Sequence, residues 1–174
     1  MSNQMKRKLT VYVDMDNVLV DFPSAFPKLP PEILKKYDNR LDEVEGIFSL
    51  MEPIEGAIDS FNELSTICDT YILSTSPWEN PSAWSDKLLW VKKHLGKAAY
   101  KRLILSHNKH LNEGDYLIDD RTANGADRFK GTHIHFGKEE FPNWHSVMKH
   151  MRHVANGGLN INDAQCLLTR KPED

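Results

Sequence analysis

The sequence predicts an α/β fold in which helices cover both faces of a parallel sheet, and two features lead to this prediction. Short apolar runs of strand length alternate along the chain with longer segments whose apolar residues recur at helical spacing. Such alternation is typical of βαβ units, which build parallel sheets. Several of the apolar runs also end in polar or charged side chains, and the carboxyl ends of parallel strands are where such sheets bind ligands.

The chain of 174 residues has the length and composition of one soluble globular domain. A chain of this size buries about 70% of the surface that it exposes when unfolded, so its core needs no disulfide or zinc staple. Its formal net charge of -3 argues against a binder of nucleic acid polymers, which usually carries a basic face. No apolar stretch reaches the length of about 18 residues that spans a membrane, and we expect no signal peptide. Cys68 and Cys166 are far apart, which fits a cytoplasmic protein without disulfides.

The first predicted strand is the most informative stretch of the chain. It runs from Leu9 to Val13 and is followed by Asp14 and Asp16, two carboxylates separated by one residue. Carboxylates this close repel one another unless a proton or a cation lies between them. A Mg²⁺ ion, which takes oxygen ligands and leaves positions for phosphate oxygens, would relieve the repulsion and create a phosphate site. Taken alone, the pair is equally compatible with a polar turn.

The next segment, residues 21–52, differs in composition from the rest of the chain. Several prolines mark turns and helix starts, and Ile33, Leu34 and Tyr37 have helical spacing. We therefore predict a small helical cap that is inserted after the first strand and is not part of the sheet.

The remaining strands and helices are predicted from residue 53 onward. The predicted strands cover residues 70–74, 103–105, 116–118 and 132–136. The predicted helices cover residues 53–68, residues 82–95 with Gly96 at the C-terminal cap, and a segment that opens at Pro142. Their expected buried faces are Ala57, Phe61, Leu64 and Cys68, then Trp84, Leu88, Val91 and Leu95, then Trp144, Val147, Met148, Met151 and Val154. We expect a single domain over residues 1–174, with a core at 9–20 and 53–155 and a C-terminal extension at 156–174.

The polar groups at the strand ends occur in a specific order, which is acid pair, hydroxyl, lysine and second acid pair. They are Asp14 and Asp16, Thr75 and Ser76, Lys109, and Asp119 and Asp120. With this order the chain resembles the haloacid dehalogenase (HAD) superfamily of phosphohydrolases. The segments around these groups, residues 14–22, 75–77 and 117–121, look most like the 5'(3')-deoxyribonucleotidase family. Asn17 stands where that family commonly has glycine, and asparagine tolerates left-handed backbone geometry better than most residues.

The resemblance implies that Asp14 is the nucleophile and Asp16 the general acid and base. Attack of the Asp14 carboxylate on phosphorus would give an aspartyl-phosphate and divide the hydrolysis into two steps. Asp16 would first protonate the departing sugar oxygen and then take a proton from the attacking water. Thr75 and Ser76 would donate hydrogen bonds to phosphate oxygens, and Lys109 would supply a compact positive charge.

The same resemblance implies a Mg²⁺ ion as cofactor. The Asp14 carboxylate, the Asp16 backbone carbonyl and one member of the Asp119–Asp120 pair would bind it, with Asp120 as the first choice. The other member would then orient Lys109 or a water molecule.

The first candidates for the wall that holds the substrate are Phe22, Trp78 and Arg121, and further aromatic candidates are Phe26, Tyr37 and Phe48. Phe22 corresponds to an aromatic residue that the family sets against the nucleotide base, where stacking adds roughly 1 to 3 kcal/mol. Trp78 and Arg121 follow the second and fourth core strands and could line the same site. For the aromatic residues the alternative is packing in a core, and for Arg121 it is an exposed loop position.

The histidines raise a different hypothesis, a structural zinc site. His133 and His135 would lie on one face of the last strand, but no third ligand follows them at a usual spacing, so we do not favour it.

The ordered groups and the family resemblance together imply a Mg²⁺-dependent phosphomonoesterase that hydrolyses (deoxy)ribonucleoside monophosphates. The resemblance is also compatible with a homodimer. One alternative is a HAD phosphatase for another small phosphorylated metabolite. A second is a phosphate-binding or regulatory protein without turnover, which would have no need of Asp16. A third, a phospho-accepting signalling receiver, has its acid pair and its acceptor in a different order.

Overall fold

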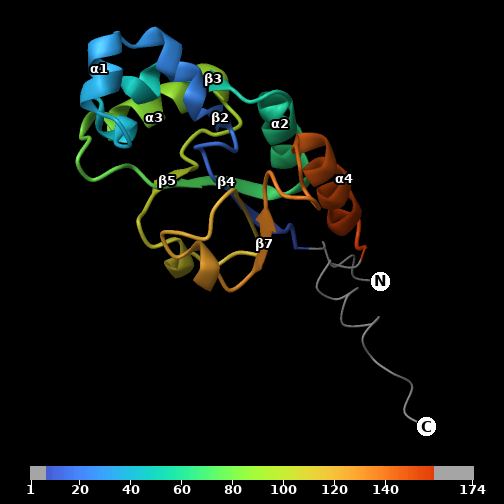
Figure 1. The fold of residues 1–174 in the computed structure, drawn as a ribbon. Coiled ribbons are helices and arrows are strands. Elements are labelled where there is room, and N and C mark those ends of the chain that lie inside the picture. The colour runs from blue at the N-terminus through green and yellow to red at the C-terminus, as the bar shows by residue number, and fades with distance from the viewer. Residues whose placement is uncertain (1–6, 159–174) are drawn as a thin grey trace, which may run out of the picture.

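Five parallel strands form the sheet at the centre of the structure, a computed structural model that describes residues 7–158 (Figure 1). In chain order they are β1 (Thr10–Val13), β4 (Asp69–Ser74), β5 (Leu103–Leu105), β6 (Tyr116–Asp119) and β7 (Thr132–His135). Across the sheet the order is β5-β4-β1-β6-β7, so the chain builds outward on one side of β1 and then on the other. The carboxyl ends of β1, β4 and β6 therefore meet where the strand order reverses, and open α/β sheets bind ligands at this point.

Helices cover both faces of the sheet, so the predicted fold class is confirmed. On one face lie α2 (Ala57–Ile67), α3 (Ser82–His94) and α4 (Trp144–Ala155), and on the other lie the short 3-10 helices η4 (Lys109–Leu111) and η5 (Ala126–Arg128) (Figure 1). The alternation of side chains along β1 divides the core in the same way. Val11 and Val13 join the cluster beneath the α-helices, whereas Tyr12 joins the cluster beneath η5.

The predicted buried faces of α2 and α4 are confirmed. Every residue expected there is buried, namely Ala57, Phe61, Leu64, Cys68, Trp144, Val147, Met148, Met151 and Val154. The start of α4 follows from Asn143, whose side chain accepts a hydrogen bond from the backbone N–H of Ser146 while the Ser146 hydroxyl lies near the backbone N–H of Asn143. The two helices also contact each other through a bidentate ion pair between Glu63 and Arg152.

The predicted buried face of α3 is wrong in its first half. Val91 and Leu95 are buried as expected, but Trp84 and Leu88 are 39% and 42% exposed. The face that packs on the sheet and cap carries Ala83, Lys87, Trp90 and Val91 instead. The prediction failed because the helix has apolar residues at consecutive positions 88–91, so that several faces look apolar, and because its buried face contains a lysine.

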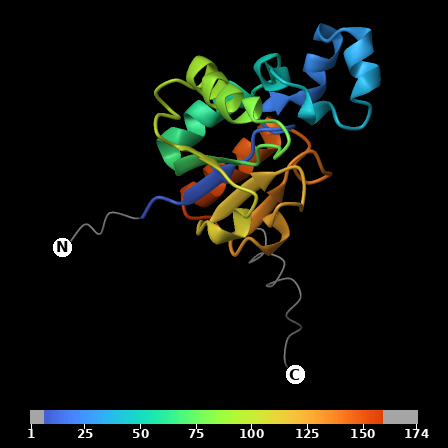
Figure 2. The ribbon, with the colours of Figure 1, turned by 90° about the vertical axis from the view of Figure 1, so that its left-hand side faces the viewer.

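The cap lies between the two strands of a separate antiparallel ribbon, β2 (Val20–Asp21) and β3 (Glu52–Pro53). Its helices are η1 (Phe22–Lys28), α1 (Pro31–Lys36), η2 (Leu41–Glu43) and η3 (Ile47–Ser49). Figure 2 shows this group of short helices projecting from one end of the core. The prediction of a small helical insertion after the first strand is confirmed, and its first helix, η1, is a 3-10 helix with Pro27 inside it.

Among the described residues, no helix is long and apolar enough to cross a membrane. The predicted C-terminal extension lies outside the described residues from position 159 onward.

Candidate active site

The loop after β1 places Asp14 and Asp16 at the point where the strand order reverses. The Asp14 backbone N–H donates to the Ile118 carbonyl at 2.9 Å, so this residue still belongs to the sheet, and its side chain is buried. The chain then turns tightly, because the N–H groups of Leu19 and Val20 both donate to the Met15 carbonyl. The turn requires a positive φ of 58° at position 17, which asparagine tolerates.

Lys109 lies between two carboxylates at the base of this site. Its Nζ atom is 3.0 Å from Oδ1 of Asp14 and 2.5 Å from Oδ2 of Asp119, and its side chain is buried. Its backbone N–H donates to the Asn124 carbonyl at 2.8 Å, which fixes the start of η4. Burial alone would lower the pKa of Lys109, but Asp14 and Asp119 outweigh it and raise the pKa, so the ammonium stays charged.

The acid pair at the end of β6 is held unequally. Asp119 uses both carboxylate oxygens, since Oδ2 contacts Lys109 and Oδ1 accepts from the backbone N–H of Arg121 at 2.9 Å. Asp120 has a buried Oδ1 without a hydrogen-bond partner among residues 7–158, and its Oδ2 lies 3.5 Å from the amide of Asn17. Burial, followed by the nearby Asp14 charge, raises the pKa of both acids.

This arrangement fits a hard divalent cation. Carboxylate oxygens of Asp14, Asp119 and Asp120 all lie within 4.8 Å of one another. All three ligand groups are oxygens, which Mg²⁺ prefers, and a cation would relieve the repulsion that raises the pKa of the acid pair. Oδ1 of Asp120 accepts no hydrogen bond among the described residues and has the Nε atom of Arg121 only at 3.9 Å, so the contacts favour Asp120 over Asp119 as a ligand.

Asp16 points one oxygen at a buried lysine that the sequence reading missed. Oδ2 of Asp16 accepts from Nζ of Lys87 at 2.7 Å, whereas the buried Oδ1 has no hydrogen-bond partner in the described part of the chain. Burial raises the pKa of Asp16, and the Asp14 charge adds to this, whereas Lys87 opposes it. Oδ1 is therefore the Asp16 oxygen that is free of hydrogen bonds among the described residues.

Lys87 lies on α3 and is fully buried. Its ammonium also donates to the Ser74 hydroxyl at 2.9 Å and to the Thr75 carbonyl at 2.8 Å, and it lies 4.8 Å from the centre of the Phe48 ring. The available sequence signal was its spacing, because Lys87 stands three and four residues before two core residues of the same helix, Trp90 and Val91.

The two hydroxyl residues after β4 differ in whether their side chains line the substrate cleft. Thr75 lines the cleft described below, and its hydroxyl donates to the Ser106 carbonyl at 2.8 Å. Ser76 is fully buried, and its hydroxyl has no hydrogen-bond partner among the described residues. The Ser76 side chain therefore does not face the cleft, and its backbone N–H is the group left to contact a phosphate.

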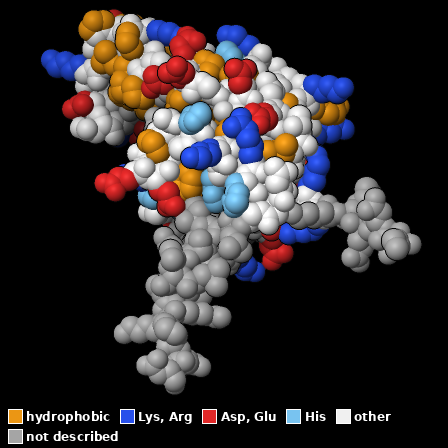
Figure 3. Space-filling model, turned by 90° about the vertical axis from the view of Figure 1, so that its right-hand side faces the viewer, with side chains coloured by type: hydrophobic (Ala, Val, Ile, Leu, Met, Phe, Trp, Pro, Cys, Tyr) orange, Lys and Arg blue, Asp and Glu red, His pale blue; other side chains and the backbone are white. Residues whose placement is uncertain are grey.

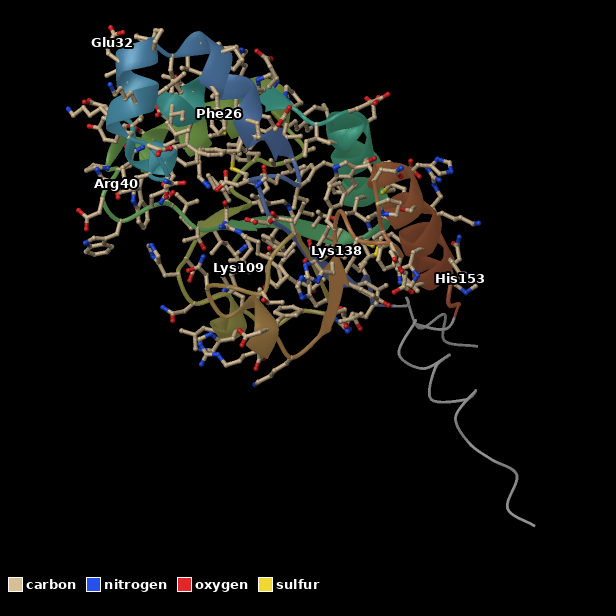
Figure 4. The ribbon with its side chains drawn as sticks, viewed as in Figure 1. Phe26, Glu32, Arg40, Lys109, Lys138 and His153 are labelled. Carbon is tan, nitrogen blue, oxygen red and sulfur yellow. The ribbon has the colours of Figure 1, made fainter. Side chains whose placement is uncertain are left out.

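A cleft of about 600 Å³ opens between the cap and the carboxyl ends of the strands. Figure 4 shows Phe26 on the cap side and Lys109 on the core side. The predicted wall residues Phe22, Trp78 and Arg121 line this cleft, as do Phe26 and Phe48, whereas Tyr37 does not. Phe22 packs against Phe26 and Phe48, with ring centres 5.3 and 5.8 Å apart, whereas Trp78 is 77% exposed at the rim beside His107.

The cap is tied to the core through α3 and the loop before it. The buried Asn80 amide donates to the carbonyls of Asp42 and Val44 at 2.8 and 2.9 Å. The Ser82 hydroxyl accepts from the backbone N–H of Gly46 at 2.8 Å. These contacts hold the aromatic wall of the cap at a defined height above the acidic groups.

The histidines of β7 support the acid pair and do not form a metal cluster. The one group of residues within 7–158 that could hold a metal contains no histidine. His133 and His135 instead contact the carbonyl oxygens of Asp119 and Asp120 through their Nε2 atoms. Burial lowers the pKa of His133.

The fold is similar to that of YfnB, a HAD-hydrolase from Bacillus subtilis whose structure was solved with magnesium bound. The match has a TM-score of 0.53 at 14% identity and covers 79% of this chain and 90% of that one. The chain therefore has the fold of a HAD-hydrolase, with its acidic, hydroxyl and lysine groups at the carboxyl ends of the strands.

A family model described as 5' nucleotidase, deoxy (pyrimidine), cytosolic type C matches residues 31–156. The chain is 58% identical over 144 residues to a Vibrio phage KVP40 protein to which 5'(3')-deoxyribonucleotidase activity is assigned, covering 83% of this chain and 85% of that protein. It is 31% identical over 183 residues to the human cytosolic-type 5'(3')-deoxyribonucleotidase, covering 86% and 85% of the two chains. The chain therefore belongs to the 5'(3')-deoxyribonucleotidase family.

Proposed function

We propose that this protein is a Mg²⁺-dependent phosphomonoesterase that hydrolyses (deoxy)ribonucleoside monophosphates to nucleoside and phosphate. The observation that carries the proposal is that two aspartates of one loop lie in different environments. Asp14 is a buried carboxylate that contacts Lys109, whereas Asp16 has a raised pKa and a partnerless oxygen beside the cleft. A nucleophile and a proton donor that lie close together suit the cleavage of a phosphate ester.

In the first step, an oxygen of Asp14 attacks phosphorus and the bond from phosphorus to the sugar oxygen breaks. The proton on Oδ1 of Asp16 passes to the departing sugar oxygen, so the nucleoside leaves neutral and Asp14 carries the phosphoryl group. In the second step, Asp16 takes a proton from a water molecule, whose oxygen attacks phosphorus. The bond to Asp14 breaks, phosphate leaves, and both aspartates return to their starting states.

Lys109 and the loop after β4 hold the phosphate during both steps. We assign the contacts with a phosphate next to Asp14 to the Lys109 charge and the backbone N–H of Ser76. The Thr75 hydroxyl joins them by exchanging its hydrogen bond to the Ser106 carbonyl for one to the phosphate. Positioning and charge neutralisation provide most of the catalysis in phosphoryl transfer.

The acid pair fits a Mg²⁺ ion, with Asp14, Asp120 and the Asp16 backbone carbonyl as ligands. When bound, this ion supplies positive charge that neutralises phosphate oxygens and opposes the repulsion among the carboxylates. Asp119 is then the residue that orients Lys109, a role that its contact with the ammonium supports.

The substrate is assigned from the cleft and the family. A cleft of about 600 Å³ can hold a nucleoside monophosphate, and its aromatic rings suit a nucleobase. All proposed site residues come from one chain, so a homodimer would not be needed to complete the site. On the face drawn in Figure 3, acidic and basic side chains are interspersed, which is unlike the basic stripe that nucleic acid polymers require. We assign the protein to the cytoplasm, as the human cytosolic-type relative supports.

A phosphatase for another small phosphorylated metabolite is the second candidate. It keeps the same mechanism and differs only in the molecule that the cleft holds. A non-catalytic phosphate binder would not need the proton donor Asp16.

The test is phosphate release from a panel of deoxy- and ribonucleoside monophosphates and sugar phosphates, with Mg²⁺ and with a chelator. We expect release that depends on the metal, is fastest with deoxynucleotides and is lost in Asp14→Asn. If phosphate is released fastest from a sugar phosphate, the proposed mechanism stands but the proposed nucleotide substrate is wrong. No turnover of any substrate by a folded protein would contradict the proposal.

A further inference from the structure

The edge strand β7 carries two histidines whose rings contact the backbone of the acid pair. Nε2 of His133 lies 3.1 Å from the carbonyl oxygen of Asp119, and Nε2 of His135 lies 2.8 Å from that of Asp120. A carbonyl oxygen only accepts hydrogen bonds, so both Nε2 atoms carry a proton and donate it. The two rings stack with centres 5.1 Å apart and an angle of 18°, so each limits the rotation of the other.

These contacts continue the hydrogen bonding of the sheet beyond the end of β6. The Asp119 carbonyl accepts from the backbone N–H of Phe136 at 3.0 Å, as a strand residue does. Asp120 is one residue past the end of β6, and its carbonyl accepts from the imidazole of His135. The imidazole therefore holds the chain at a point where the pairing of strands has stopped.

The Asp120 side chain depends on this backbone support because it has few contacts of its own. Its Oδ1 has no hydrogen-bond partner within residues 7–158, and its Oδ2 reaches the Asn17 amide only at 3.5 Å. The Nε atom of Arg121 lies 3.9 Å from Oδ1 of Asp120, and the Arg121 side chain is 56% exposed. A shift of the backbone at position 120 would therefore displace the carboxylate. Asp119, by contrast, is fixed at both oxygens.

We propose that His133 and His135 are positioning residues for the divalent cation, acting through the carbonyls of Asp119 and Asp120. This inference rests on the proposed function, because it needs the cation site of the acid pair. Removing a group that supports a metal ligand typically weakens metal affinity by about 10- to 100-fold. His135 has the larger effect, because the Asp119 carbonyl keeps its bond from Phe136 when His133 is lost.

The test compares His135→Met with His135→Gln. Glutamine places its amide nitrogen as many bonds from Cβ as the Nε2 of histidine and can donate, whereas methionine has similar length and no donor. Mn²⁺ binding is measured without substrate, from the electron paramagnetic resonance signal of free Mn²⁺ during a titration with MnCl₂. We expect about a tenfold higher dissociation constant for His135→Met and a value close to wild type for His135→Gln. His145→Met, at an exposed position on α4, is the control and should bind as wild type does.

Equal weakening by Met and Gln, or wild-type binding by His135→Met, would overturn the inference. If His135→Met does not fold, His133→Met and His133→Gln provide the same comparison with a smaller expected difference. Asp120→Asn separates this inference from the proposed function. If Asp120→Asn loses Mn²⁺ binding and His135→Met keeps it, the inference alone fails. If wild type and Asp120→Asn bind Mn²⁺ equally weakly, the cation site itself is refuted, and the inference falls with it.

Discussion

The ammonium of Lys87 lies 2.7 Å from Oδ2 of Asp16, and no part of the lysine side chain reaches solvent. The same ammonium contacts the Thr75 carbonyl and lies over the Phe48 ring of the cap. One buried cation thus joins the candidate proton donor, the phosphate-binding loop and the cap. Oδ2 of Asp16 accepts this hydrogen bond whether or not Oδ1 carries a proton, so Lys87 and Asp16 each hold the other in place.

Replacing Lys87 by methionine should lower kcat and move its pH profile upward. Burial raises the pKa of Asp16 and Lys87 opposes this, so loss of the ammonium raises the pKa further. The first step needs Asp16 protonated and the second needs it deprotonated. Both the rising and the falling part of the pH profile of kcat that depend on Asp16 therefore shift to higher pH. We expect kcat at neutral pH to fall by about 10²-fold, since general acid–base catalysis contributes that much or more.

The matched control is Lys92→Met, which removes an exposed lysine from the same helix. Its pH profile should coincide with that of wild type. A Lys87→Met profile that is lowered but not shifted would mean that Lys87 acts on the fold alone.

Asn80→Ala should loosen the cap. Two carbonyls, those of Asp42 and Val44, lose their donor in this variant, and buried polar groups left unpaired cost about 1 to 3 kcal/mol. The melting temperature should fall, and KM should rise more than kcat falls, because the aromatic wall moves while the core groups stay. Asn62→Ala, at an exposed position on α2, should change neither. A loss of kcat at unchanged KM would contradict a role in positioning the cap.

The positions of the strand ends could be predicted from the sequence because they depend on local patterns. An apolar run followed by Asp14, Thr75 or Asp119 marks the end of a strand wherever that strand lies, and a parallel sheet then brings these ends together. Lys87 could not be predicted in this way, because its burial depends on Asp16 and Phe48, which are distant in the sequence. The alternation that placed His133 and His135 on one face was equally visible, but their partners are backbone carbonyls of another strand and leave no trace in the sequence.

Trp78→Ala should weaken nucleotide binding and leave the chemistry intact. Trp78 is 77% exposed at the rim of the cleft, so its removal has little effect on folding. Stacking on a base contributes about 1 to 3 kcal/mol, which corresponds to a rise in KM of roughly 5- to 150-fold. Glycerol phosphate, which has no base, should show no change. Tyr100→Ala, at an exposed site away from the cleft, is the control. An equal rise in KM for both substrates would exclude a base-stacking role.

Asp120→Asn should stabilise the protein when no divalent cation is present. Burial and the Asp14 charge raise the pKa of Asp120 above its usual value, so the folded state binds more protons than the unfolded state. Under that condition the free energy of unfolding falls as pH rises from about 4 through the folded pKa. Asparagine removes this penalty, and the melting temperature of the metal-free variant at neutral pH should therefore exceed that of wild type.

Added Mg²⁺ should reverse this order. Wild type gains stability because the cation binds the folded state only, whereas Asp120→Asn has lost a ligand and should gain little. Asp119→Asn provides the contrast: it leaves Asp120 in place but removes a partner of Lys109, so it should be less stable than Asp120→Asn without metal and should still respond to Mg²⁺. The measurement is the melting temperature of wild type, Asp120→Asn and Asp119→Asn, each with a chelator and with Mg²⁺. The opposite result is stabilisation by Mg²⁺ that persists in Asp120→Asn and is lost in Asp119→Asn. It would mean that Asp119, the residue that contacts Lys109, is the metal ligand and that Asp120 is not.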